Sequence, residues 1–231
     1  MRKYKVNLKL IRLFVIIVLV EIIFCCGLEQ QTDDYPIIEA KATLAKWKDN
    51  KKAVLSLFFD DSTPGQATLG VPALISRNLV GTWFVNPGAE YYNNNLNTWE
   101  NIVLAGGQEL ANHSFTHSGA TTQGQVIYEV GEAAKAIWRI RKQDDYGSLM
   151  GFCTGGGTTW DAGILAQVLN NYKCIDRQAN AGVKITATTI LPGSNANTIF
   201  NLVPKVIDAG IWGRLHFHGI SKTSGTYPLD Y

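Results

Sequence analysis

The chain has 231 residues, of which 46% are hydrophobic and 17% charged, and its formal net charge is +2. Residues 1–26 carry five Lys or Arg against one Glu, so the remainder has a net charge of about −2. That part lacks the basic surplus of a nucleic-acid-binding protein, and we expect no nucleic-acid partner. It is long enough for one substantial core and short for two, so we expect one domain.

The N-terminal segment has the pattern of an export signal. Basic residues come first, and residues 13–26 are apolar except for Glu21. Three interpretations stay open: a cleaved signal peptide, a lipoprotein signal lipidated at Cys25 or Cys26, and an uncleaved membrane anchor. We therefore predict an exported protein, secreted or anchored to the cell envelope, whose membrane contact is confined to residues 1–26. Residues 27–47 are expected to be a linker, and residues 48–231 the folded domain.

Strand-like and helix-like segments alternate along the rest of the chain. They begin with residues 53–59, 67–78, 81–86, 99–106 and 109–112. A long helix is predicted for residues 123–141, because its apolar residues recur on one face. Further units cover residues 148–153, 162–172, 173–177, 183–190, 195–210 and 212–219. This alternation predicts βα units around a parallel sheet.

All four histidines fall in two short clusters. His113 and His117 lie in "NHSFTH", His216 and His218 lie in "LHFHG", and a paired acid, Asp60 and Asp61, ends "AVLSLFFDD". Each cluster alone is usually structural, but together they have the composition of a metal site, since histidine and carboxylate are ligands that zinc prefers. These residues close strand-like runs, so they are expected to meet at the carboxyl ends of the strands. A helical turn or helical loop would bring the imidazoles of the first cluster to one side.

Four successive segments resemble the motifs of the polysaccharide deacetylase family, also called the NodB homology domain or carbohydrate esterase family 4. They are "LSLFFDDS", "GTWFVN", "WENIVLAGGQELANHSFTH" and "LHFHGI", and the resemblance covers roughly residues 48–231. It implies an α/β fold, a distorted and incomplete (β/α) barrel. It also implies a divalent metal, with zinc preferred over cobalt or nickel. The roles that it implies are the base for Asp60, the metal ligands for Asp61, His113 and His117, and the general acid for His218.

The sequence departs from the family pattern in several places. Ser62 stands where a glycine is usual, and the stretch "GFCTGGGTTW" has neither the arginine nor the proline of the family's third motif. Arg177 resembles the arginine of a family subgroup and is our candidate to orient Asp60; the alternative is an exposed arginine in a surface ion pair. The family's final helix has no counterpart after His218, so we expect the chain to be truncated at its C-terminus.

The resemblance predicts a metal-dependent hydrolase that removes N-acetyl or O-acetyl groups from a cell-envelope or extracellular polysaccharide. The alternatives are a non-catalytic carbohydrate-binding or scaffold domain that retains the metal site, and an amidase acting on a small non-sugar substrate. The sequence leaves the oligomeric state open.

Cys153 and Cys174 are expected either to pair in an oxidising compartment or to remain buried free thiols. His216 is expected to be a packed, hydrogen-bonded core residue; the alternative is that it lines the pocket or orients a neighbouring side chain.

Overall fold

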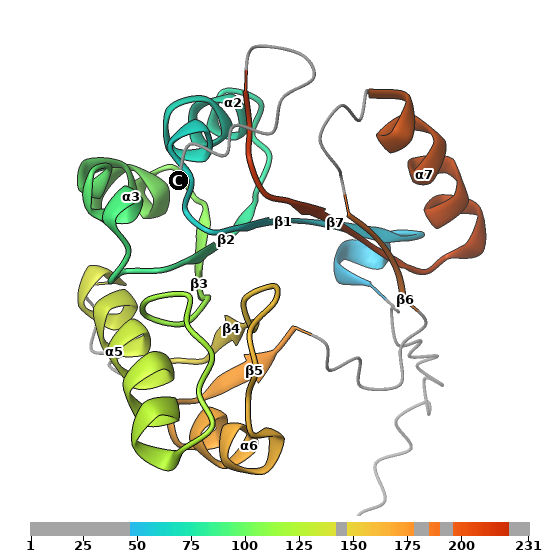
Figure 1. Ribbon diagram of the computed structural model, residues 1–231. Helices are drawn as coiled ribbons and strands as arrows, with labels where there is room; N and C mark the ends of the chain where they lie inside the picture. Colours follow the sequence, from blue (N-terminus) through green and yellow to red (C-terminus); the bar gives the residue numbers. More distant parts are fainter. Residues whose placement is uncertain (1–46, 142–146, 178–184, 190–195, 222–231) are drawn as a thin grey trace, which may run out of the picture. The chain divides into compact units, whose positions relative to one another are not determined.

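The computed structural model describes residues 47–141, 147–177, 185–189 and 196–221 (Figure 1). The predicted export signal and all but the last residue of the predicted linker lie outside these described residues. Among the helices that are described, none combines the length and apolar character needed to cross a membrane.

Within the described residues, seven strands form one sheet in the order β5-β4-β3-β2-β1-β7-β6. Each strand runs parallel to its neighbours. The carboxyl ends of all described strands therefore lie at one edge. The strands are β1 (Val54–Asp60), β2 (Thr82–Val85), β3 (Glu109–Asn112), β4 (Met150–Phe152), β5 (Cys174–Asp176), β6 (Ile185–Thr189) and β7 (Trp212–Phe217).

Helices connect the strands and cover the sheet (Figure 1). Two of them, α5 and α6, pack together beside β3 and β5, whereas α7 packs against β1 and β7. The helical segments are η1 (Lys48–Asn50), η2 (Gln66–Gly70), α2 (Val71–Ile75), α3 (Glu90–Asn93), η3 (Thr98–Ile102), α4 (Val103–Ala105), α5 (Gln123–Arg141), α6 (Ala162–Asn171) and α7 (Ala196–Ala209). The arrangement is a distorted, incomplete (β/α) barrel, as the sequence predicted.

The central strands carry buried apolar side chains on both faces. Phe59, Trp83 and Leu110 belong to the large core that also includes apolar side chains of α5 and α6. Phe58, Phe84, Ala111 and Cys153 form a smaller apolar cluster. Successive side chains of a strand point to opposite faces, so this second cluster lies on the face opposite the large core. We call this the inner face, because it faces the interior of the incomplete barrel. Asp60 follows the same alternation and shares the inner face with Phe58.

Helix α5 confirms the prediction from apolar spacing. Val126, Val130, Ala133 and Ile137 are fully buried, and Ile140 is partly buried. These residues recur every three or four positions, so they form one stripe that faces the sheet. The packing of this stripe places α5 directly behind the segment that follows β3.

Candidate active site

The acid pair lies at the carboxyl end of β1, where the backbone changes direction. Asp60 is the last residue of the strand, and Asp61 and Ser62 adopt positive φ angles of 81° and 56°. Aspartate tolerates this left-handed conformation better than most side chains. The backbone amide of Asn86 donates to the Ser62 hydroxyl at 3.0 Å and holds the turn against the end of β2. The bend lets two consecutive carboxylates reach neighbouring parts of one site.

The first histidine cluster lies in an irregular loop after β3. The expectation of a helical turn is wrong, because Ser114 and His117 have positive φ angles of 70° and 62°. The Ser114 hydroxyl accepts a hydrogen bond from the His117 backbone amide at 3.1 Å, which closes the turn. Glu129 of α5 accepts hydrogen bonds from the backbone amide and the hydroxyl of Thr116, at 2.9 and 2.6 Å. The loop is thus fixed from both sides.

Asp61, His113 and His117 converge on one point. Asp61 Oδ1 lies 3.1 Å from Nε2 of His113 and 3.1 Å from Nε2 of His117. One ligand atom from each of the three residues lies within 4.8 Å of the others. One carboxylate and two imidazoles are a donor set for a divalent transition metal, and three protein ligands leave positions open for water or substrate. The residues present therefore fit a catalytic metal ion.

The charges at this triad agree with a positively charged occupant. Burial raises the pKa of Asp61, but the hydrogen bonds with His113 and His117 outweigh it and hold this pKa well below its usual range. The hydrogen bond with Asp61 raises the pKa of His117 and outweighs the opposite effect of burial. Asp61 is consequently ionised, and its negative charge favours a cation beside it, either a proton on His117 or a metal ion.

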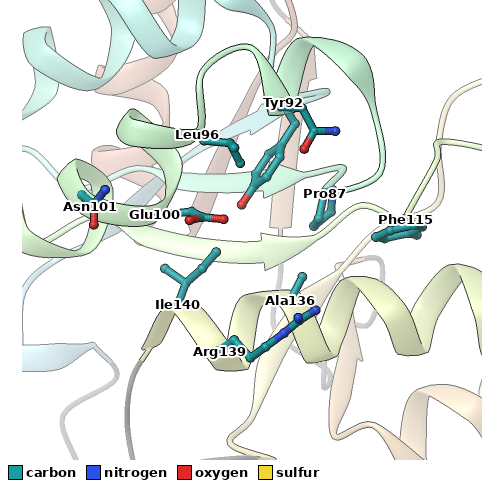
Figure 2. Close-up of a pocket in the computed structure, with 10 residues that line it drawn as sticks. Pro87, Tyr92, Leu96, Glu100, Asn101, Phe115, Ala136, Arg139 and Ile140 are labelled. Atoms are coloured by element: carbon teal, nitrogen blue, oxygen red, sulfur yellow. The ribbon is translucent and has the colours of Figure 1, made fainter.

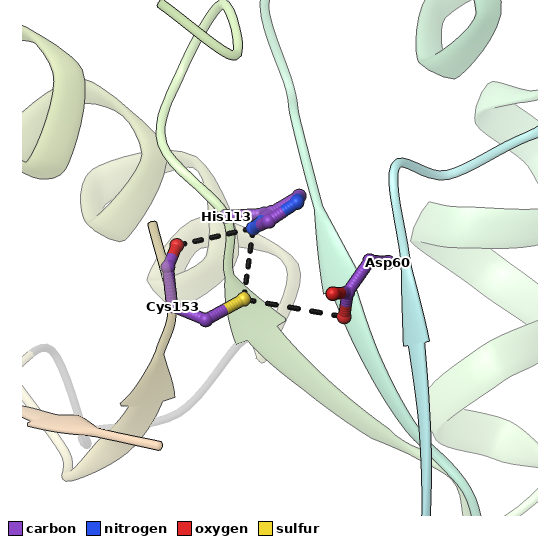
Figure 3. Close-up of side chains that lie close together, drawn as sticks. All are labelled: Asp60, His113 and Cys153. Carbon is purple, nitrogen blue, oxygen red and sulfur yellow. Dashed lines mark hydrogen bonds between the residues drawn. The ribbon is translucent and has the colours of Figure 1, made fainter. Parts of the chain in front are cut away.

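Cys153 contacts the Nδ1 side of His113, opposite Asp61, and fixes the orientation of the imidazole. His113 Nδ1 lies 3.0 Å from the Cys153 carbonyl oxygen and 2.8 Å from its sulfur, as Figure 3 shows. A carbonyl oxygen only accepts, so Nδ1 carries a proton, and Nε2 is left either to bind a metal ion through its lone pair or, when protonated as well, to donate to Asp61. The neutral form with its proton on Nδ1 is the tautomer that a metal ligand needs. Cys153 Sγ also lies 4.0 Å from Asp60 Oδ1, which places the thiol between the two residues.

Asp60 points into a second group of side chains beside the triad. Arg177 contacts Asp60 Oδ1 at 2.6 Å in an ion pair whose two side chains are 8% and 4% exposed. The guanidinium also lies over the Phe84 ring, 4.8 Å from its centroid. His218 Nε2 lies 3.9 Å from the other carboxylate oxygen of Asp60. The structure thus brings all six sequence-predicted site residues to the same edge of the sheet, and Arg177 is in a buried pair rather than a surface pair.

Three polar residues that support this edge were missed by the sequence analysis. The buried amide of Gln66 donates to the carbonyl oxygens of Asp60, at 2.6 Å, and His218, which ties the end of β1 to the end of β7. Asn86 donates to the His113 carbonyl oxygen at 2.6 Å, and Glu129 holds the histidine loop from α5. For Glu129 the available signal was a polar residue on the apolar face of the helix predicted for residues 123–141, whereas Gln66 precedes the helix-like segment predicted for residues 67–78 and had no such signal.

The two cysteines outside the N-terminal segment are free thiols, and both are buried. The disulfide alternative is therefore wrong, and the free-thiol alternative is confirmed. Burial raises the pKa of the Cys153 thiol well above its usual value, and the nearby Asp60 carboxylate adds to the effect. Cys153 is accordingly a neutral thiol at physiological pH.

His216 packs on the inner face of the sheet but lacks the hydrogen bond expected of it. Its ring centroid is 5.6 Å from that of Phe58, and within the described part of the chain its buried Nε2 atom has no hydrogen-bond partner. Burial, followed by the nearby positive charge of Arg177, lowers the pKa of His216 to about 4. The packed-core prediction is confirmed for its position, and the hydrogen-bonded part of that prediction is wrong.

Comparison with known proteins places these features in context. A family model described as polysaccharide deacetylase matches residues 47–175. Among solved structures, the fold is similar to the Bc1960 peptidoglycan N-acetylglucosamine deacetylase, at 16% identity over 74% of each chain and a TM-score of 0.53. It is also similar to a carbohydrate esterase family 4 pseudoenzyme from Bacillus anthracis, at 14% identity and a TM-score of 0.50 over 72% of this chain. The match covers 55% of the pseudoenzyme chain. No curated protein matches by sequence.

Proposed function

Because the chain belongs to the polysaccharide deacetylase family, we propose that it is a metal-dependent hydrolase that removes acetyl groups from a cell-envelope or extracellular polysaccharide. One observation carries this proposal: Asp61 Oδ1 lies 3.1 Å from Nε2 of both histidines, beside a second carboxylate, Asp60. The two carboxylates have different partners, which is the arrangement that a division of labour between ligand and base requires.

Asp61, His113 and His117 would hold the metal ion, for which zinc is our first choice and cobalt or nickel the alternatives. A divalent cation at this position supplies Lewis acidity that polarises an acetyl carbonyl and makes water more acidic. Everything else in the site is supplied by the chain itself. The hydrogen bond from His113 Nδ1 to the Cys153 carbonyl keeps the imidazole in the ligating tautomer.

Asp60 is proposed as the general base. It takes a proton from the attacking water, while Arg177 holds its carboxylate in place at 2.6 Å. His218, which faces Asp60 across 3.9 Å, donates a proton to the departing amine or alkoxide. The products are acetate and a free amino or hydroxyl group on the sugar. In this proposal Arg177, which follows β5, takes the place of the motif arginine that the segment "GFCTGGGTTW" lacks.

A binding or scaffold role is the second candidate. It is favoured by the segment "GFCTGGGTTW", which lacks the arginine and proline of the family's third motif. One similar structure is described as a pseudoenzyme, and a mutant of it as having restored enzymatic activity, so this fold does not by itself imply turnover. The buried pair of Arg177 and Asp60 favours the catalytic candidate.

Amide hydrolysis of a small non-sugar substrate by the same residues is the third candidate function. We also propose that the chain is exported.

Two substitutions separate the roles of base and ligand. Asp60→Asn should retain bound metal but lower kcat/KM for acetate release by about 10²- to 10⁴-fold, because an amide cannot accept the proton. His117→Ala should lose both metal and activity, because it removes a ligand. Metal content and acetate release from acetylated chito-oligosaccharides, peptidoglycan and acetylated xylan measure both effects.

The matched control is Asp208→Asn on α7, where the carboxylate is 79% exposed and distant from the triad in sequence and fold. This control should retain metal and activity. An Asp60→Asn protein with wild-type turnover would contradict the proposed base. Metal binding without acetate release from any of the three substrates would favour the binding role instead.

A further inference from the structure

A pocket lies outside the proposed catalytic site, between α5 and the segment that contains α3 and η3 (Figure 2). Its volume is about 450 Å³, which is within the range of pockets that bind small molecules. None of the six proposed site residues lines it. The residues that do are Pro87, Tyr92, Asn93, Leu96, Glu100, Asn101, Phe115, Ala136, Arg139 and Ile140.

Tyr92 presents an unused hydrogen-bonding group to this pocket. Its side chain is 2% exposed, and its hydroxyl has no hydrogen-bond partner among the residues that the structure describes. Figure 2 shows the hydroxyl end pointing away from α3 and toward α5, between Glu100 and Pro87. A buried hydroxyl without a partner is costly, and native structures rarely leave one unless a ligand or water completes it. The group therefore indicates a polar ligand.

The charged groups near the hydroxyl have opposite signs. Burial raises the pKa of Tyr92, the carboxylate of Glu100 raises it further, and the guanidinium of Arg139 lowers it in part. Tyr92 is consequently protonated and can donate. Glu100 comes from η3 and Arg139 from α5, so the pocket offers an acceptor on one side and donors on the other.

The remaining lining narrows the class of ligand. Leu96, Ile140 and the Phe115 ring supply apolar surface, and two asparagine side chains supply further donors and acceptors. A lipid chain would leave the polar groups unpaired, and a strongly charged ligand would meet one group of its own sign. A neutral ring that carries hydroxyls on its edge and C–H groups on its faces matches all of these surfaces.

The pocket shares a wall with the loop that carries the histidines. Phe115 lies between His113 and His117 in that loop, and the Gly88 amide donates to its carbonyl oxygen at 2.8 Å. We propose that this pocket is a binding site for a neutral saccharide unit, with the Tyr92 hydroxyl donating to a sugar oxygen. The proposal goes beyond the deacetylase function, since binding here needs neither a metal ion nor turnover.

Isothermal titration calorimetry of the whole 231-residue chain tests this site. The probes are two neutral oligosaccharides, a tetramer of N-acetylglucosamine and one of glucose. Tyr92→Phe, which removes only the hydroxyl, should weaken binding by about tenfold. Ala136→Phe should abolish binding by filling the pocket. The matched control is Tyr128→Phe on α5, where the side chain is 49% exposed and does not line the pocket.

Three comparisons decide the outcome. Titrations in the Asp60→Asn background avoid turnover of the acetylated probe: Tyr92→Phe should still weaken binding by about tenfold there, and binding that Tyr92→Phe leaves unchanged would show that the ligand occupies the catalytic site. The proposal is overturned if neither neutral probe binds, or if both pocket variants bind like wild type. Tighter binding of oligosaccharides of glucosamine or of a uronic acid would overturn the assignment to a neutral ligand. Thermal unfolding of Tyr92→Phe should show no loss of stability, which distinguishes a ligand contact from a structural one.

Discussion

Arg177 forms a buried ion pair with Asp60, although the two residues lie 117 positions apart in the sequence. The family's third motif follows the long helix, and here that segment contains no arginine. Arg177 instead comes from the end of β5, and its backbone amide bonds to the Phe152 carbonyl at 2.7 Å. This places the guanidinium over Phe84 and against Asp60. Removing one partner of a buried ion pair leaves an uncompensated charge, so the pair is expected to be sensitive to substitution at either end.

The sequence could name Arg177 only as a candidate, since its burial depends on a strand pairing. Whether residue 177 reaches Asp60 is decided by β5 lying beside β4, which no local pattern specifies. The contact of Cys153 with His113 is a similar case. A single cysteine at the end of a short strand has no signature that distinguishes a packed thiol from one half of a disulfide. The contacts of Arg177 and Cys153 therefore depend on long-range packing.

The unpartnered His216 imidazole predicts a loss of stability in acid. Its pKa is about 4 in the folded chain and about 6.5 when unfolded. Between these values the unfolded state binds more protons, so stability falls as pH drops from about 6.5 to about 4. His216→Leu should remove this component, which we expect to be on the order of 2 kcal/mol for a half-buried ring. Denaturant unfolding of both proteins across this pH range measures the difference.

The control for this prediction is the slope of stability against pH, because other groups titrate in the same range. Wild type and His216→Leu should differ in slope only between the two pKa values and run parallel above neutral pH. Parallel curves throughout would mean that the imidazole is as easily protonated in the folded chain as in the unfolded one.

At the scale of elements, hydrophobic pattern predicted most of the described structure. Strand β3 and helix α5 occupy the residues that the sequence indicated, and β1 and β7 each differ by a residue or two at their ends. Helix α3 was missed, because its four residues, Glu90–Asn93, are too few for a periodic pattern. The loop after β3 was expected to be helical from the spacing of its histidines. Its two positive φ angles are stabilised by Asn86, Ser114 and Glu129, contacts that spacing cannot reveal.

Helix α6 offers a test of local stability that is independent of the site. Asp161 is its N-cap, and the side chain accepts a hydrogen bond from the Ile164 backbone amide at 2.8 Å. Asp161→Ala should lower the free energy of unfolding by about 1 kcal/mol, because it leaves that amide without its partner. Asp161→Asn, which keeps the accepting oxygen, should cost much less. Thermal or denaturant unfolding measures both, and equal losses would indicate that charge rather than the capping hydrogen bond stabilises the helix.

At the scale of the whole described domain, topology explains why distant residues meet. Asp60, Asp61, His113, Arg177 and His218 follow four different strands, and every strand points its carboxyl end to the same edge. The sequence could predict this convergence, because parallel βα units always place strand ends together. It could not predict which pairs touch. Those contacts depend on the bend at Asp61 and on the order in which β1, β7 and β6 are paired.

The same convergence predicts that metal binding stabilises the whole domain. A ligand that binds only the folded state adds RT ln(1 + [L]/Kd), or about 2.7 kcal/mol at a hundredfold excess over Kd. Zinc should therefore raise the melting temperature of the wild-type chain, and a chelator should reverse the rise. Asp61→Asn should lose most of this response, because it removes the charge shared by His113 and His117. Asp208→Asn, which alters an exposed carboxylate, should respond like wild type, and an equal response from Asp61→Asn would place the metal elsewhere.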